Sequence, residues 1–503
     1  MTRESQARSC LRLWPLLLAL ALLPAGCKKA EEDKNSITGS VSAPFGDAGG
    51  VIVEVYAAPE FVSTDVWSAT AAHPEVGFLY DLPAAWDYRR QSSQLRARDT
   101  TGADGTFEFP DFADGDYILS ARKTGYGWSV PRAVGLHGQS VDAGTLALAE
   151  VDTLPANAVL TGENRWLAGR HYIIQSRLSV AQGATLTIEP GAVVRLPLDT
   201  KINVLGTLIA EGEPGRFIIF TSNEAVPDLG DWWYILFSQS ASLPQFRYCA
   251  FRYADDAIRS LRPGGRIEYC YFGSIGAQGV SLLGHTDAAM DSIVFRRNVT
   301  NDVQLVLLVS NVAAQRPMLI ERNAIYGSAN YGVKLVTAYS GAVRCNWFYA
   351  CGHTDVSTGT ATGALYLFNA RDIEVDHNEF RKSQYGVDLG SLVDSSVHIH
   401  NNYFYLLLRA LNVGWTPETV GPSFPHFNFN CIQAVEHYHI YMGTCVINTE
   451  SIDANNNYWD GFSEFGLRQR FLYDHDDDPT CPYVTVGTIL PSCNRSEAGL
   501  CGL

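Results

Sequence analysis

The stretch that decides the fold runs from residue 183 to residue 210 and reads GATLTIEPGAVVRLPLDTKINVLGTLIA. β-Branched and aliphatic residues alternate with polar ones in short runs, a pattern typical of half-buried strands. Pro190-Gly191 and Gly206 separate the runs, and these residues indicate tight turns. The segment therefore predicts short strands joined by turns.

Downstream, one sequence pattern recurs. Its central residue is a cysteine or an asparagine, and successive copies lie 21 to 32 residues apart, a period typical of solenoids. The central residues are Cys249, Cys270, Asn298, Asn323, Asn346, Asn378, Asn402, Asn430 and Asn457. We expect two further columns to point inward. Three positions earlier stand Phe246, Ile267, Phe295, Ile320, Val343, Val375, Ile399 and Phe427, with Ala454 as the exception. Two positions later stand Phe251, Phe272, Thr300, Ile325, Phe348, Phe380, Phe404, Ile432 and Trp459.

A polar column lies two positions before the asparagines and alternates in charge from Arg247 to Asp376. In stacked parallel strands this alternation pairs opposite charges, so we expect the column to face water. The asparagines suit a bend, because asparagine tolerates the left-handed conformation and stacked amides can hydrogen-bond along the axis. Helical and leucine-rich solenoids are the alternatives, and the strand-like alternation disfavours helices.

Residues 183–210 resemble the opening coils of pectate-lyase-like right-handed parallel β-helix proteins, and residues 456–459 with 474–478 resemble their closing coil. The resemblance covers about residues 153–490. It implies an all-β fold in which a right-handed parallel β-helix solenoid follows an N-terminal β-sandwich. It does not imply an activity, because enzymes, adhesins and structural proteins share this solenoid.

The sandwich is expected from residue 37 to residue 150, where apolar residues alternate in period two and Asp104-Gly105 and Asp114-Gly115 indicate turns. The run from Thr101 to Phe107, with Gly115-Asp116-Tyr117, resembles the carboxypeptidase regulatory-like, transthyretin-like domain. Residues 59–98 depart from that family as a long insertion. Such domains usually act as spacers or adhesive modules, and a binding loop in the insertion is the alternative.

Residues 1–26 have the charged start and short apolar core of a secretory signal, which is too short to span a bilayer. Leu23-Pro24-Ala25-Gly26-Cys27 resembles a bacterial lipobox, although Pro24 stands where the motif usually has leucine. The resemblance implies an exported protein that is lipidated on Cys27, anchored to a membrane, and carried on a tether over residues 27–36. Lys28 favours the outer membrane or cell surface, and residues 491–503 are expected to form a C-terminal tail.

The chain has 53 acidic and 37 basic residues and a formal net charge of −16, which argues against nucleic acid as a partner. Of its 11 cysteines, nine remain after Cys10 and Cys27 are set aside, so at least one must stay free or pair elsewhere. Three neighbouring pairings stay open: Cys345 with Cys351, Cys431 with Cys445, and Cys481 with Cys493 or Cys501.

Histidines and carboxylates gather on one expected strand face of successive coils. The group comprises Glu374, Asp376, His398, His400, His426 and Asp453, which we name the imidazole patch. Residues two apart on a strand share a face, and the next coil lies about 4.8 Å away. The patch could hold a divalent metal or place an acid and a base on a sugar. A solvated polar face is the other interpretation.

Two acidic segments and several aromatic residues are weaker candidates. Asp474, Asp476 and Asp478 offer alternating carboxylates for calcium or another divalent metal, although an EF-hand motif is absent and an acidic turn is the alternative. Asp255-Asp256 lacks the motif of pectin-degrading hydrolases and is interpreted as a turn. Outward rings that could stack on sugars are expected among Trp232, Trp233, Tyr234, Tyr269, Tyr271, Tyr403 and Tyr405.

The sequence favours a non-catalytic surface lipoprotein that binds polysaccharide or other envelope components. It establishes no cofactor, and calcium or another divalent metal is the candidate. The alternative is a polysaccharide lyase, hydrolase or epimerase that acts on the outer face of the β-helix through the imidazole patch. A third alternative is an accessory role in metal-enzyme maturation.

Overall fold

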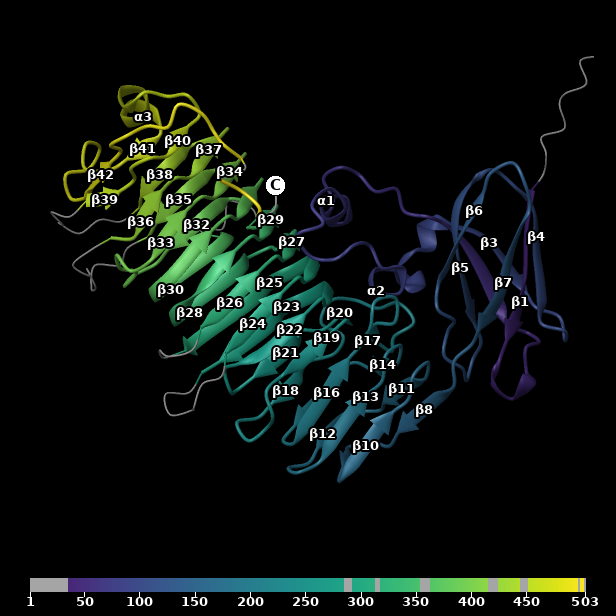
Figure 1. Cartoon of the computed structure of the whole chain (residues 1–503). Coiled ribbons are helices and arrows are strands. Elements are labelled where there is room, and N and C mark those ends of the chain that lie inside the picture. The colour runs from purple at the N-terminus through teal and green to yellow at the C-terminus, as the bar shows by residue number, and fades with distance from the viewer. Residues whose placement is uncertain are drawn as a thin grey trace, which may run out of the picture.

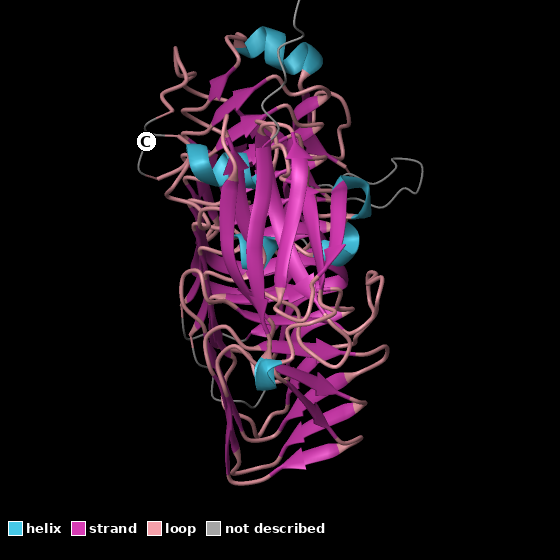
Figure 2. Cartoon of the chain, turned by 90° about the vertical axis from the view of Figure 1, so that its right-hand side faces the viewer, coloured by secondary structure: helices cyan, strands magenta, loops and turns pink. Residues whose placement is uncertain are grey.

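The computed structural model describes residues 35–284, 292–312, 317–352, 362–414, 424–443, 451–495 and 498–501. Over these residues the chain is almost entirely strands and loops, with a few short helices (Figure 2). A β-sandwich precedes a long parallel β-helix, as predicted (Figure 1). The proposed signal, Cys27 and most of the tether lie outside the described residues. No described helix is long and apolar enough to cross a membrane.

The sandwich packs a three-stranded sheet, in the order β4-β1-β7, against a four-stranded sheet, in the order β3-β2-β5-β6. Its core is built from alternating apolar residues such as Val53, Val55, Phe107 and Phe109. Gly105 supplies the expected left-handed turn, with φ of 76°. The strands are β1 (Asn35–Ser42), β2 (Ile52–Ala57), β3 (Leu95–Thr100), β4 (Thr106–Phe112), β5 (Gly115–Arg122), β6 (Arg132–Leu136) and β7 (Val141–Ala147).

The β-helix has three parallel faces, which we name the first, second and third sheets. Four long strands turn a corner and contribute to two sheets each: β23 (Tyr271–Leu283), β25 (Val299–Val312), β28 (Tyr331–Arg344) and β30 (Gly363–Asp376). The other strands of the first sheet are β10 (Glu163–Trp166), β13 (Thr185–Ile188), β16 (Thr207–Glu211), β19 (Gln245–Arg247), β22 (Gly265–Glu268), β24 (Ile293–Arg296), β26 (Met318–Glu321), β33 (His398–His400) and β36 (His426–Asn428), with β39 (Ser451–Asp453) beside β36.

Of the corner strands, β23 and β25 belong to the second sheet. Its other strands are β8 (Val151–Leu154), β11 (His171–Ile174), β14 (Val193–Leu196), β17 (Ile218–Ser222), β20 (Cys249–Arg252), β27 (Ala324–Tyr326), β29 (Trp347–Tyr349), β31 (Glu379–Arg381), β34 (Tyr403–Tyr405), β37 (Cys431–Gln433) and β40 (Tyr458–Trp459). The third sheet adds β9 (Ala158–Leu160), β12 (Arg177–Val180), β15 (Lys201–Val204), β18 (Ile235–Phe237), β21 (Asp256–Ser260), β32 (Tyr385–Leu389), β35 (Arg409–Val413), β38 (Tyr438–Met442) and β41 (Leu472–Tyr473). A last strand, β42 (Tyr483–Thr485), pairs with β39.

Both predicted inward columns are confirmed: every member is at most 2% exposed, including Ala454 and Thr300. The asparagine column is confirmed as an internal ladder, because each of the seven amides is fully buried. In one step of it, Asn323 donates through its backbone N–H and its Nδ2 to Asn346 Oδ1, at 3.0 and 2.8 Å. The ladder thus satisfies backbone groups where each coil bends.

The bend itself differs from the prediction. The left-handed residue is the one before each asparagine, for example Arg322 with φ of 57° and His377 with φ of 53°, and not the asparagine. The asparagine fits this position because its side-chain amide is buried and can both donate and accept hydrogen bonds. The charged column pairs as expected, with Arg344 Nε 3.1 Å from Glu321 Oε2, but Glu268 and Glu321 are buried beneath their arginines.

Two disulfides have both cysteines within the described residues, and they rule out all three suggested pairings; Cys445 itself lies outside the described residues. Cys345 bonds Cys501, and Cys431 bonds Cys493, because the C-terminal segment runs back along the second sheet. Cys481 is also disulfide-bonded. The odd count correctly predicted free thiols: Cys249, Cys270 and Cys351 are free and buried.

Three helices sit at the ends and flank of these domains (Figure 1). Helices α1 (Val66–Ala72) and α2 (Leu82–Ala85), with short 3-10 turns at Tyr88–Arg90 and Ser92–Gln94, form the insertion between β2 and β3. Helix α3 (Glu464–Arg470) lies at the C-terminal end, where its Leu467 joins the β-helix core. A further 3-10 turn, Pro44–Gly46, follows β1.

Candidate functional site

The imidazole patch lies on the first sheet in the predicted register, with Glu374 opposite His398 and Asp376 opposite His400. The side chains form separate contacts. Glu374 reaches both imidazoles, with its oxygens 3.2 Å from His398 Nδ1 and 3.0 Å from His400 Nε2. These three side chains are 32–47% exposed, so the patch is a partly solvated ion-pair surface.

The rest of the patch is held in pairs. His426 Nδ1 lies 3.1 Å from Asp453 Oδ2, whereas Asp376 contacts its neighbour His377 at 2.6 Å. Burial pulls the pKa of Asp453 upward, but hydrogen bonds from His426 and Asn455 outweigh it and leave that pKa below its ordinary value. Within the described ranges, no group of three or more His, Cys, Asp or Glu residues is arranged to hold a metal ion. The geometry therefore gives no support to a metal site in the patch.

The acidic segment at the C-terminal end is organised around an arginine. Arg468 Nη1 lies 3.2 Å from both Asp474 Oδ2 and Asp476 Oδ2, and Asp474 is buried. Asp478 instead accepts hydrogen bonds from Thr480, which lower its pKa. A calcium ion at these carboxylates would have to displace Arg468, and calcium binding here stays a prediction. Asp256 is not in a turn: it begins β21, is buried, and pairs with Arg259.

The second sheet is covered by the chain itself. In the insertion, Trp67 packs its ring 5.6 Å from that of Tyr271, in a buried cluster that also contains Ala250, Val299 and Trp347 of the sheet. The backbone N–H of Gly77 donates to the carbonyl of Arg322 at 2.6 Å. The insertion therefore binds this chain's own β-helix, which accounts for its length.

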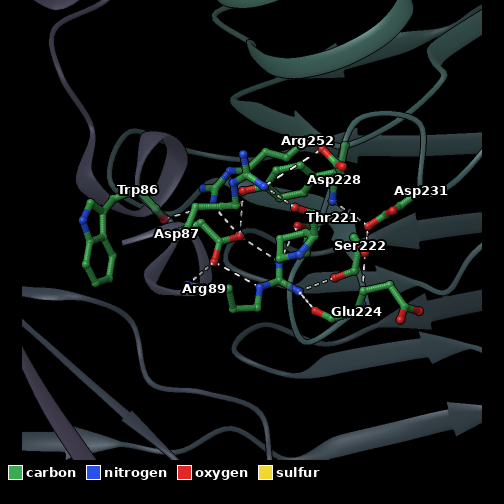
Figure 3. Close-up of polar contacts among 12 residues, drawn as sticks. Trp86, Asp87, Arg89, Thr221, Ser222, Glu224, Asp228, Asp231 and Arg252 are labelled. Atoms are coloured by element: carbon green, nitrogen blue, oxygen red, sulfur yellow. Dashed lines mark hydrogen bonds and ion pairs between the residues drawn. The ribbon is translucent and has the colours of Figure 1, made fainter. Parts of the chain in front are cut away.

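Two buried arginines fasten the insertion (Figure 3). Arg89 pairs with Asp87 at 2.7 Å and donates to Thr221 Oγ1 and to the carbonyls of Ser222 and Glu224. From the β-helix side, Arg252 donates to the carbonyl of Trp86 at 2.9 Å. Burial alone would raise the pKa of Asp87, but the two guanidiniums hold it below its ordinary value, so the carboxylate stays charged.

The C-terminal tail covers the remaining coils of the same sheet. Ala498 packs in a buried cluster with Tyr403 and Cys431, and Arg495 Nη2 lies 3.1 Å from the buried Glu379 Oε2. The rings of Tyr271 and Tyr403 are thus buried, as is Trp232, and only Trp233 (38% exposed) and the half-buried Tyr234, Tyr269 and Tyr405 match the expectation of outward rings.

The third sheet carries a groove of about 490 Å³ that the sequence analysis missed. Its floor is a register column that runs from Lys334 through Tyr366 and Asp388 to Asn412, with Tyr441 on the next coil. Tyr331 stands at its wall. We name the five lining residues Tyr331, Lys334, Tyr366, Asp388 and Asn412 the Asp388 groove; Tyr441 lies beyond its lining.

The Asp388 groove is linked by polar and ring contacts. Asp388 accepts hydrogen bonds from the Tyr331 hydroxyl at 2.5 Å and from Asn412 Nδ2 at 2.7 Å. Lys334 Nζ lies 4.9 Å from the ring centre of Tyr366. Beside the groove, Arg409 places its guanidinium 3.6 Å above the Tyr441 ring and donates to Asn412.

Burial dominates the acidity of Asp388. It raises the pKa of this carboxyl above its ordinary value, and the hydrogen bonds from Tyr331 and Asn412 and the charges of Arg409 and Lys334 only partly oppose it. Burial and the neighbouring carboxylate also raise the pKa of Tyr331, so its hydroxyl remains a donor. The groove thus combines a buried carboxyl of raised pKa, a cation and the rings of Tyr331 and Tyr366, which are groups that bind and polarise sugars.

The comparison with protein families agrees with this architecture. Residues 234–405 match the family model described as the right handed beta helix region. The matched region includes Tyr331, Lys334, Tyr366 and Asp388 of the groove. The searches of curated proteins and of solved structures each gave no match.

A sequence signal for the groove existed. Residues 331–335 read YGVKL and residues 385–389 read YGVDL, two coils apart on the same sheet. The asparagine columns show which residues face inward on the first two sheets only, because the corner that leads to the third sheet varies in length. The repeated YGV triplet would have aligned the strands of the third sheet in the same way.

Proposed function

We propose that this protein is an exported lipoprotein, anchored through Cys27, whose β-helix binds polysaccharide along the third sheet. The observation that carries the proposal is the Asp388 groove, where rings, a cation, an amide and a carboxyl line one open channel. Aromatic rings stack on the apolar faces of sugars, while the polar groups bond their hydroxyls. The chain's own insertion and tail occupy the second sheet, which leaves the third available.

The sandwich fits this proposal as a spacer. In a lipidated chain it would stand between the membrane anchor and the β-helix, to which the insertion fastens it. Several acyl chains on Cys27 would hold the molecule at a membrane, as a single chain would not. Radiolabelled palmitate should enter the full-length protein and not a Cys27→Ser variant; equal labelling would remove the anchor from the proposal.

Binding is tested with a panel of neutral and acidic polysaccharides in affinity electrophoresis. The mature chain should be retarded by at least one of them, and Lys334→Gln together with Tyr366→Ala should abolish that retardation. As a matched control, His398→Ala with His400→Ala changes the first sheet only and should leave it unchanged. Retardation that is lost in the histidine variant and kept in the groove variant would move the site to the imidazole patch.

A second candidate function is depolymerisation in the same groove, and the buried carboxyl of Asp388 beside Lys334 favours it. A raised pKa is what a general acid acting on a glycosidic oxygen requires. Release of unsaturated or reducing ends by wild type, absent in Asp388→Asn, would establish catalysis. Release that survives Asp388→Asn and disappears in His398→Ala would instead assign it to the imidazole patch, as the sequence alternative predicts.

A further inference from the structure

A cavity of about 390 Å³ lies between the sandwich and the first coils of the β-helix. The sandwich contributes Ser120 and Trp128, the insertion contributes Trp86, and the second sheet contributes His171 and Arg252. The volume suits a small molecule of one ring. Neither domain forms this cavity alone, because its walls come from both.

Three of the lining side chains carry a buried polar atom with no hydrogen-bond partner among the described residues. They are Ser120 Oγ, His171 Nδ1 and Arg252 Nε, on side chains that are 1%, 3% and 6% exposed. A buried polar group without a partner costs about 1–3 kcal/mol, so native proteins rarely keep three together without a use. All three can donate a hydrogen bond.

Two guanidiniums outside the lining lie beside Trp128, a residue of the cavity wall. Trp128 is flanked by two guanidiniums, with Arg195 and Arg89 at 4.6 and 4.9 Å from its ring centre. Arg195 has no ion-pair partner in the part of the chain that the structure describes, and burial and Arg89 lower its pKa to about 10. Asp87 is the one carboxylate among the lining residues, and Arg89 and Arg252 already neutralise it.

His171 is placed to act as an uncharged donor in this cavity. Burial, Arg195 and Arg89 lower its pKa to about 3, so the imidazole can donate from one nitrogen without adding charge. Its ring packs edge-on to Trp128 with centres 4.7 Å apart. An aromatic wall, free donors and surplus positive charge together describe a receptor for an anion attached to a ring.

We propose that this interdomain cavity binds a small ring-bearing carboxylate, either a sugar acid or an aromatic acid. The carboxylate accepts hydrogen bonds from the free donors, and the ring lies against the tryptophans. Arg216 lines the cavity, is 54% exposed and pairs with Glu213 at 3.0 Å, so its guanidinium is placed to give the anion a further contact. This site is separate from the Asp388 groove and does not depend on polysaccharide binding there.

The test is calorimetric titration of the full mature chain with glucuronate and with benzoate, each beside its neutral counterpart, glucose and benzyl alcohol. At least one carboxylate should bind with a dissociation constant below about 1 mM, and its neutral counterpart at least about tenfold more weakly. Binding of glucuronate alone identifies a sugar-acid site, and binding of benzoate alone identifies an aromatic-acid site.

Two variants locate the binding. Ser120→Leu should abolish it by filling the cavity, and Arg216→Gln, on an exposed side chain, should weaken it about tenfold. Arg266→Gln is the matched control, since Arg266 is 56% exposed and paired with a glutamate but lies on the first sheet. The proposal is overturned if neither carboxylate binds, if the neutral counterparts bind equally, or if Arg216→Gln behaves like Arg266→Gln.

Discussion

The hydroxyl of Tyr331 donates a 2.5 Å hydrogen bond to the carboxylate of Asp388, which stands two coils further along the third sheet. The intervening coil has Gly363 at the matching register position, where an added Cβ would lie 2.7 Å from the carbonyl oxygen of Tyr385. The contact ties three coils together at a buried residue of the groove. It also ties stability to pH.

The raised pKa of Asp388 predicts how stability changes with pH. Because the folded chain keeps this proton to a higher pH than the unfolded chain, the contribution is full below about pH 3.9, the unfolded value, and is lost as pH rises through the folded value. Wild type should therefore lose stability relative to Asp388→Asn over that window in urea titrations. Tyr331→Phe removes a bond that favours the charged form and should extend the window upward. A difference that is constant with pH would contradict the assignment.

The buried asparagines of the ladder should contribute more to the free energy of unfolding than the more exposed polar residues beside them. Asn346→Ala removes side-chain bonds to Asn323 and Ile320 on one neighbouring coil and to Asn378 on the other, and should cost about 2–3 kcal/mol in the free energy of unfolding. Asn428→Ala changes a half-buried asparagine in the outer column and should cost less than about 0.5 kcal/mol. Chemical denaturation compares the two, and equal costs would mean that the ladder adds nothing.

The insertion should be fastened mainly by Arg89. Arg89→Ala leaves the buried Asp87 with only the more distant Arg252, 3.8 Å away, and should cost about 3–5 kcal/mol at the interface, so the sandwich and β-helix should unfold in two separate calorimetric transitions. Arg90→Ala removes a half-exposed arginine that bonds the Pro227 carbonyl and should keep the wild-type profile. A single unchanged transition in Arg89→Ala would show that the apolar cluster alone fastens the insertion.

The Cys431–Cys493 disulfide should hold the C-terminal tail on the second sheet. It closes a separation of 62 residues, and the loop-entropy relation gives about 4 kcal/mol of stabilisation. The double variant Cys431→Ala, Cys493→Ala should lower the unfolding midpoint and expose the tail to limited proteolysis. Resistance equal to wild type would mean that Cys345–Cys501 is sufficient.

The sequence predicted the β-helix in detail because two of its columns are fixed by the core. Phe246 to Phe427 must fill the same interior on every coil, and Asn298 to Asn457 must meet one another, so both leave a readable period. The left-handed residue before each asparagine left no such period, since Arg297, Cys345, His377 and Phe429 share no chemistry.

The site was harder to predict than the fold, because its residues do not recur on every coil. The sequence predicted a site among polar residues of the first sheet, since the asparagine column places them on one face; in the structure they form ion pairs at the surface. Asp388 belongs to a sheet whose corners vary in length, and its burial depends on Tyr331, two coils away. The disulfides and the docking of the insertion depend on long-range contacts that no local pattern records.

The central claim is that polysaccharide lies against the Tyr366 ring on the floor of the Asp388 groove. The ratio of two dissociation constants tests it most directly. The dissociation constant of an oligosaccharide from the retarding polymer is measured by calorimetry for Tyr366→Ala and for Tyr405→Ala, which removes a half-buried tyrosine from the second sheet. Loss of one stacking ring is worth about 1–1.5 kcal/mol, so Tyr366→Ala should weaken binding about tenfold while Tyr405→Ala keeps the wild-type value. Equal affinity in the two variants would contradict the account.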